Sequence, residues 1–184
     1  MANVRGQQID KTYLSLEQAQ GRGFIHREYM AHCFRWSHVA KWLNQGKRYQ
    51  TAHLLDVACG IETPLPKMLF SMRYCHTTGS YTGVDYNKLK HPETISTKTD
   101  KFNMKLIGGV DFLTTKMPLK SYDVIVNFEM LEHIEAFHAF QMMQKMRDLM
   151  SKNGHAFLST PCYSAHVGAA DNHVSEISYH AFKA

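Results

Sequence analysis

The chain has 184 residues, of which 44% are hydrophobic and 20% are charged, and it includes 10 Phe, 9 Tyr and 2 Trp. This balance excludes a disordered or fibrous chain. A single domain of this length buries roughly 70% of the surface that its unfolded chain exposes, so disulfide or metal staples are unnecessary. No apolar run reaches the ~18 residues that a membrane-spanning helix requires.

The net charge gives only a weak indication of a polyanionic partner. The formal charge is +5, from 21 Lys and Arg against 16 Asp and Glu, and the pI is about 9.0. Such a balance favours approach to nucleic acid. The basic residues are scattered, however, with small groups at 41–48 and 98–105, so a solvated surface is favoured over a nucleic-acid footprint.

The cysteines and the first residues of the chain indicate a reducing compartment. Cys33, Cys59, Cys75 and Cys162 show no C-x-x-C spacing, and the N-terminal residues include no apolar secretory segment. We therefore expect reduced thiols in the cytoplasm. We interpret Cys162 as a small buried residue rather than a nucleophile.

The N-terminal part is predicted to consist of an arm and a helix. Residues 1–24 are polar and contain Gly21 and Gly23, which predicts a flexible arm, with one domain over 25–184. Helical periodicity followed by Asn44-Gln45-Gly46 predicts a leading helix over 25–45. The apolar residues expected on its buried face are Ile25, Tyr29, Phe34, Trp36, Val39, Ala40 and Leu43.

Beyond this helix, short apolar runs alternate with helical segments, a pattern typical of a parallel sheet with helices on both faces. The predicted strands are 53–57, 81–84, 105–107, 122–127 and 155–159. A helix over 63–74 is predicted with its prolines in the first turn, where proline is tolerated. A second helix over 135–150 is predicted to bury a stripe of Phe137, Phe140, Met143, Met146, Leu149 and Met150.

Acidic residues lie at or just beyond the carboxyl ends of the first three of these strands. Asp56 ends the first strand ahead of a small-residue turn, an arrangement that lets a ligand approach the backbone. Asp85 ends the second strand, where a carboxylate can accept hydrogen bonds from both ribose hydroxyls of an adenosine cofactor. Asp111 and Phe112 follow the third strand, where they can hold an adenine ring. The spacing therefore predicts a nucleotide site.

The motifs together, in this order, resemble one family. They are LLDVACG, YTGVDYN, GGVDF, YDVIVNFEMLEHI, LMSKNGHAFLSTP and NHVSEIS, within residues 53–178. This set is similar to the class I S-adenosylmethionine-dependent methyltransferases, in particular the group that includes ubiquinone- and menaquinone-biosynthesis enzymes and many phage proteins. A phage member would work in the host cytoplasm.

The resemblance implies S-adenosylmethionine as cofactor and assigns roles to individual residues. The methionine portion would lie against Asp56 and the backbone of Ala58-Cys59-Gly60, with Asp85 at the ribose and Tyr86, Asp111 and Phe112 around the adenine. Asn127, Phe128 and Glu129 would line the inner wall. The chain departs from the family's glycine loop at Ala58 and at Glu62, whose bulky anion is expected to weaken cofactor binding.

The implied fold is a Rossmann-like doubly wound sheet with strand order 3-2-1-4-5. Because the sequence ends at Ala184, we expect the family's sixth and seventh strands to be missing. The fifth strand would then be an edge whose hydrogen-bonding groups are left open or covered by the N-terminal segment, a second copy or a partner chain.

The expected reaction is methyl transfer by in-line displacement to a small-molecule or nucleotide-type acceptor. Catalytic base candidates are Glu132 and His133 after the fourth strand, and His173 and Glu176 after the fifth. A capping or core role for the Glu132-His133 pair is equally open. No metal site is expected, because the His166, Asp171 and His173 spacing matches no metal signature.

Two alternatives to this enzyme remain at the level of sequence. The first is a noncatalytic methyltransferase-like subunit, or a truncated relic, that binds a partner chain. The second is a nicotinamide-dependent oxidoreductase, which the missing G-x-G-x-x-G fingerprint disfavours. Methylation of DNA base amines is also disfavoured, because residues 127–130 lack the two prolines typical of those enzymes.

Overall fold

The computed structural model describes residues 27–44, 51–61, 63–71, 79–89, 103–163, 165, 168–169 and 172–183. The predicted arm, the expected start of the leading helix at Ile25, and the residues Glu62, Cys75, His166 and Asp171 lie outside this part. None of the helices within it is long and apolar enough to cross a membrane.

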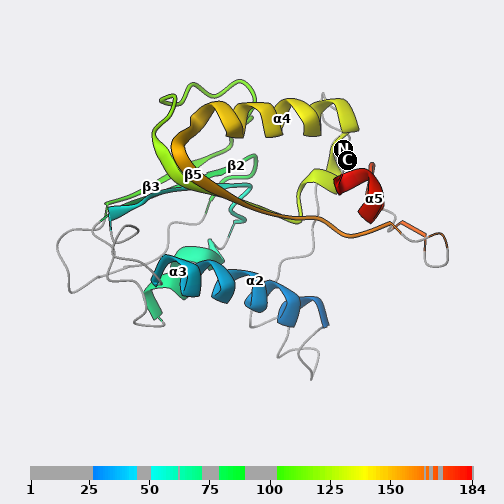
Figure 1. Ribbon diagram of the computed structural model, residues 1–184, viewed down its shortest axis with the longest axis horizontal. Coiled ribbons are helices and arrows are strands. Elements are labelled where there is room, and N and C mark those ends of the chain that lie inside the picture. The colour runs from blue at the N-terminus through cyan, green and yellow to red at the C-terminus, as the bar shows by residue number, and fades with distance from the viewer. Residues whose placement is uncertain are drawn as a thin grey trace.

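Five parallel strands form one sheet in the order β3-β2-β1-β4-β5 (Figure 1). The strands are β1 His53–Val57, β2 Ser80–Asp85, β3 Asn103–Gly108, β4 Tyr122–Phe128 and β5 Met150–Ser159. The central strand β1 pairs in parallel with both β2 and β4. The predicted fold class and strand order are thus confirmed.

Helices cover both faces of the sheet (Figure 1). The helices α2 (Arg27–Asn44) and α3 (Pro64–Ser71) lie on one face, and α4 (Ala136–Leu149) lies on the other. A short 3-10 turn, η2 (Leu131–His133), follows β4, and α5 (Tyr179–Lys183) ends the described chain. Each face has its own apolar cluster, one under α4 and one between the sheet, α2 and α3.

The predicted buried faces of two helices are partly wrong. In α4 the buried residues are Ala139, Met142, Met146 and Leu149, whereas Phe137 and Phe140 are 65% and 54% exposed. Successive residues of a helix are rotated by about 100°, so Phe137 and Ala139 point about 160° apart and one stripe cannot bury both. In α2, Trp36 and Leu43 are buried as predicted, but Phe34 is 71% exposed.

The fifth strand also differs from the prediction. Its regular ladder with β4 begins at His155 opposite Val124, as predicted, but pairing already starts at Met150 opposite Tyr122, with an irregularity in between. After this strand Cys162 forms an isolated bridge to Ile177. The expectation that Cys162 is buried is wrong, because this bridge lies at the surface and leaves the thiol exposed.

A buried polar pair crosses from β1 to β2. The Tyr81 hydroxyl donates to Asp56 Oδ2 at 2.7 Å, and the two residues are only 0% and 5% exposed. Burial raises the pKa of Asp56 to about 7, with the Tyr81 hydrogen bond opposing this shift and the Asp85 charge adding to it. Asp56 is therefore an interior group of the sheet.

We predict that Asp56 makes stability depend on pH in a specific direction. The folded chain keeps the Asp56 proton between pH 4 and 7, where the unfolded chain has lost it, so stability falls as pH rises through that window. Asp56→Asn keeps an acceptor for Tyr81 and removes the ionisation. Between pH 4 and 7, the free energy of unfolding of Asp56→Asn should therefore rise relative to that of the parent, by up to about 1.4 kcal/mol per pH unit.

Urea unfolding at pH 4.5 and 7.5 measures this difference. The matched control is Asp148→Asn, which makes the same substitution at an exposed acid on α4. If the unfolding free energies of Asp56→Asn and the parent differed by the same amount at both pH values, the raised pKa of Asp56 would be contradicted.

The turn after β1 contains a strained residue. Ala58 has φ +60° and Gly60 has φ +76°, and the backbone N–H groups of Ala58 and Cys59 both donate to the Val84 carbonyl, at 2.8 and 3.2 Å. The left-handed region costs a residue with a Cβ roughly 1–2 kcal/mol. Ala58 therefore occupies a conformation that glycine adopts without strain.

We predict that Ala58→Gly stabilises the protein by about 1 kcal/mol, because it relieves this strain. Ala156, an exposed residue in β5, is the control, and Ala156→Gly should cost about 0.5–1 kcal/mol. Urea unfolding at pH 7.5 compares the two. Equal destabilisation by both substitutions would show that Ala58 is not strained.

Candidate active site

Asp85 connects the turns after β1 and β2. Its Oδ2 accepts the Gly60 N–H at 2.9 Å and its Oδ1 accepts the Asn87 N–H at 2.8 Å. Burial raises the pKa of Asp85, while the N–H groups of Asn87 and Gly60 oppose that shift. The carboxyl group therefore lies at the carboxyl ends of adjacent strands, where open α/β sheets bind ligands.

The β1 turn presents its backbone rather than its side chains. Cys59 is 4% exposed, and it fits because Gly83 on β2 has no side chain; a Cβ there would lie 2.9 Å from Cys59 Sγ. Burial, with the charges of Asp56 and Asp85, raises the pKa of the Cys59 thiol far above its usual range. Cys59 is thus a neutral packing residue.

The loop after β3 lies against the Asp85 turn, because the Val110 N–H donates to the Asp85 carbonyl at 3.2 Å. Asp111 Oδ1 accepts the Leu113 N–H at 2.8 Å. Phe112 is 7% exposed within the core under α4, and Lys145 Nζ lies 4.8 Å from its ring centre. Of the predicted adenine residues, the side chain of Tyr86 is the exposed one.

Asn127 lies at the end of β4 and has an unsatisfied atom. Its Nδ2 donates to the Val57 carbonyl of β1 at 2.9 Å, and its side chain is fully buried. Among the described residues, its Oδ1 has no hydrogen-bond partner. Because the chain reverses its winding direction between β1 and β4, this acceptor lies at the switch point of the sheet.

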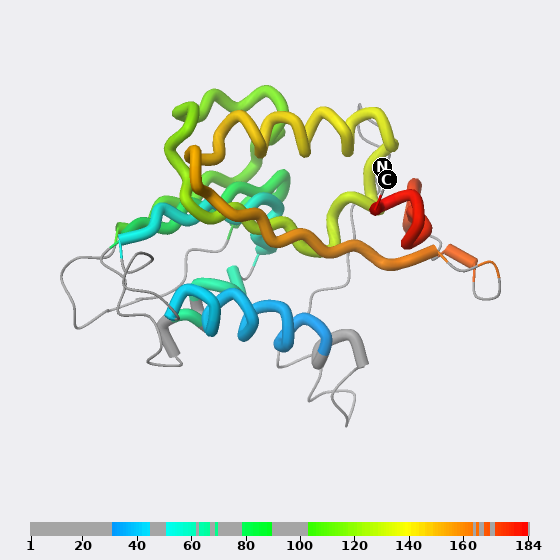
Figure 2. Tube along the Cα trace, in the orientation of Figure 1, coloured from blue at the N-terminus to red at the C-terminus, as the bar shows by residue number. Residues whose placement is uncertain are grey.

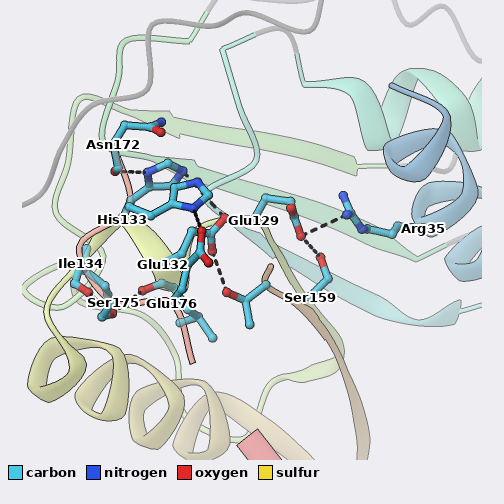
Figure 3. Close-up of polar contacts among 12 residues, drawn as sticks. Arg35, Glu129, Glu132, His133, Ile134, Ser159, Asn172, Ser175 and Glu176 are labelled. Carbon is cyan, nitrogen blue, oxygen red and sulfur yellow. Dashed lines mark hydrogen bonds and ion pairs between the residues drawn. The ribbon is translucent and has the colours of Figure 1, made fainter. Parts of the chain in front are cut away.

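Glu129, two residues further on, is held in a strained conformation at φ +53°. Its Oε1 accepts a hydrogen bond from Ser159 Oγ at 2.8 Å and pairs with Arg35 Nη2 of α2 at 3.2 Å (Figure 3). Among the described residues, the other guanidinium nitrogen, Arg35 Nη1, is buried without a partner. Such strain is found at functional sites. Phe128, by contrast, packs against the α2 and α3 cluster.

The three sequence-predicted catalytic residues come together after β4. The ligating atoms of Glu132, His133 and His173 all lie within 4.8 Å of one another. Glu132 is 1% exposed, and its Oε2 accepts a hydrogen bond from Thr160 Oγ1 at 2.9 Å. Burial raises the pKa of Glu132 to about 7, with the Glu129 charge adding to the shift and His173 opposing it.

The segment after β5 brings His173 to this cluster. Figure 2 shows that the chain turns back after β5, so that the segment before α5 lies beside the turn after β4. The N–H groups of Val174 and Ser175 both donate to the Glu132 carbonyl, at 2.7 and 3.0 Å. His173 Nδ1 in turn contacts Glu176 Oε1.

Sequence reasoning missed several members of the site. Arg35 lies on a helix far from the motifs, and nothing in its local sequence distinguishes it from other surface arginines. Ser159 and Thr160 could have been found, because they stand at the carboxyl end of β5, where ligand-binding residues gather in such sheets.

Comparison with known proteins shows the family to which the chain is similar. The model of a family described as "Methyltransferase domain" matches residues 25–182. A ubiquinone biosynthesis O-methyltransferase from Pelagibacter ubique (strain HTCC1062) is 29% identical over 117 residues, which cover 62% of this chain and 44% of that protein. The chain thus spans less than half the length of this curated relative.

Solved structures share the fold. A SAM dependent methyltransferase from Archaeoglobus fulgidus gives a TM-score of 0.56 at 17% identity, covering 94% of this chain and 71% of that one. The 1,6-didemethyltoxoflavin-N1-methyltransferase of Burkholderia thailandensis, solved with 1,6-didemethyltoxoflavin and S-adenosylhomocysteine bound, gives 0.54 at 11% identity, covering 86% and 69%.

The family match covers most of the chain, and the strand order agrees with that of the structural neighbours. The resemblance of the motifs to class I S-adenosylmethionine-dependent methyltransferases is therefore confirmed, and this chain belongs to the methyltransferase domain family.

Proposed function

We propose that this chain binds S-adenosylmethionine at the carboxyl ends of β1, β2 and β4 and transfers its methyl group to a small-molecule or nucleotide-type acceptor. The observation that carries the proposal is a pair of unsatisfied buried groups of opposite kind, the acceptor Asn127 Oδ1 and the donor Arg35 Nη1. A ligand that carries both an ammonium and a carboxylate satisfies both of them.

The amino-acid end of the cofactor has these two charges. Asn127 would accept from its ammonium, and Arg35 would donate to its carboxylate. At the other end Asp85 offers ribose hydroxyls the remaining lone pairs of both oxygens, each of which already accepts one backbone N–H. The residues present therefore fit the cofactor, although two of the side chains assigned to it by the motifs, Asp56 and Phe112, are interior.

The cofactor supplies an electrophilic methyl group on a positively charged sulfur, so positioning accounts for much of the catalysis. Oxygen acceptors must also lose a proton. Glu132 and His133 follow the same strand as Asn127, and His173 reaches them from the segment after β5. We assign proton removal from the acceptor to this cluster. The acceptor itself would be identified by screening nucleosides, nucleic acids and quinone precursors with a labelled methyl donor.

Glu62, whose expected weakening of cofactor binding would favour the noncatalytic alternative, lies outside the described residues. A partner chain or second copy along the β5 edge stays a prediction, and sedimentation of the full chain tests it. Binding of S-adenosylhomocysteine with methyl transfer to some acceptor by a monomer would exclude the noncatalytic alternative.

The ribose assignment predicts that Asp85→Asn weakens S-adenosylhomocysteine binding about 10- to 100-fold, because a charge-assisted hydrogen bond contributes roughly 1.5–3 kcal/mol. Calorimetry measures the change, with Asp148→Asn as the matched exposed control. Unchanged affinity in Asp85→Asn, or no binding by the parent chain at millimolar ligand, would contradict the proposal.

The amino-acid assignment predicts a separate effect of Arg35. Arg35→Gln should weaken S-adenosylhomocysteine about tenfold and should weaken adenosine, which lacks the carboxylate, much less. Arg147, a 69% exposed arginine of α4, provides the control Arg147→Gln. Equal losses for the two ligands would show that Arg35 acts on the fold of the site rather than on the carboxylate.

A further inference from the structure

The Glu132, His133 and His173 cluster has a second property, which concerns metal ions. We propose that these three side chains form a binding site for one divalent first-row transition metal ion, with Zn²⁺ as the reference ion. The catalytic use of this ion rests on the proposed methyl transfer, whereas its binding does not.

The distances within the cluster suit a common ion. Two ligands of a tetrahedral Zn²⁺ lie about 3.4 Å apart, as follows from metal–ligand distances of about 2.1 Å. Glu132 Oε1 and His133 Nε2 are 3.8 Å apart, and all three ligating atoms lie within 4.8 Å of one another. Small side-chain rotations therefore bring the three atoms to bonding distance of one ion.

Both histidines are oriented as metal ligands are. His133 Nδ1 lies 3.0 Å from the Asn172 carbonyl oxygen (Figure 3). Since a carbonyl can only accept, Nδ1 carries the proton, and in the neutral ring Nε2 carries the lone pair that faces Glu132. His173 Nδ1 contacts the Glu176 carboxylate in the same way. Outer carboxylate or carbonyl partners of this kind fix the tautomer of metal-bound histidines.

The backbone keeps the two halves of the site together. Besides the two N–H bonds to the Glu132 carbonyl, Ser175 Oγ donates to the Ile134 carbonyl at 2.6 Å. These bonds connect the segment that carries His173 to the turn that carries His133. The ligands are therefore held near their binding geometry before an ion arrives, which reduces the entropic cost of binding.

The donor set indicates the class of ion. Two imidazoles and one carboxylate suit Zn²⁺, Mn²⁺ or Fe²⁺, whereas Mg²⁺ and Ca²⁺ prefer all-oxygen sites. Three protein ligands leave at least one position open, as in catalytic metal sites. In that position the ion would coordinate an acceptor hydroxyl and lower its pKa, so that the proton leaves to water. The three side chains would then promote proton loss through the ion and would not take the proton themselves. The inference thus favours a hydroxyl compound as the acceptor.

The test uses the untagged full chain after dialysis against a chelator. Calorimetric titration with Zn²⁺ should give one equivalent bound to the parent, and Co²⁺ should give the visible absorption of a nitrogen- and oxygen-ligated ion. His173→Ala should abolish both signals. Glu176→Gln, which keeps all three ligands, should lower Zn²⁺ affinity about 10- to 100-fold.

His180→Ala is the matched control, because His180 is an exposed histidine on α5, and it should bind Zn²⁺ as the parent does. The absence of a one-to-one site in the parent, or equal Zn²⁺ affinity in the parent and in Glu176→Gln, would overturn the inference. Circular dichroism checks that the variants fold; should His173→Ala fail to fold, the Glu176→Gln result decides.

Calorimetry with S-adenosylhomocysteine on the same metal-free protein separates the two proposals. Cofactor binding without a Zn²⁺ site would refute the metal site and leave the proposed function intact. A Zn²⁺ site without cofactor binding would support the metal site and refute the proposed function.

Discussion

The parallel pairing of β1 with β2 on one side and β4 on the other is the constraint on which the candidate site depends. Parallel strands end at the same edge of a sheet, so this pairing brings Asp85, the β1 turn and Asn127 to one edge. The reversal of winding between β1 and β4 opens the crevice there. The buried bonds from Asn127 to β1 and from Tyr81 to Asp56 hold these strands together from inside.

A second constraint is the return of the chain after β5. The Glu132 carbonyl accepts two N–H groups from residues 174 and 175, and this contact places His173 beside Glu132 and His133. Glu129, bonded to Ser159 and Arg35, connects β4 to β5 and to α2. The cofactor end and the acceptor end of the proposed site are therefore built from the same short segment, residues 127–133.

The sequence predicted the sheet and the strand-end acids well, because a buried parallel strand leaves a strong apolar pattern and ligand sites follow strand ends. It predicted side-chain burial less well. Phe34, Phe137 and Phe140 are exposed, since a helix with apolar residues on several sides does not reveal which stripe faces the sheet. The burial of Asp56 and Phe112 was not predicted, because it depends on neighbours such as Tyr81 and Lys145, which come from distant parts of the chain. Arg35 was not predicted for the same reason, because its partner Glu129 lies in a distant part of the chain.

A crystal structure of the full chain with S-adenosylhomocysteine tests the central claim most directly. The account predicts that the amino group of the ligand lies within hydrogen-bonding distance of Asn127 Oδ1, with its carboxylate at Arg35 and its ribose at Asp85. A ligand bound elsewhere, or bound at this edge with Asn127 Oδ1 still unsatisfied, would contradict it.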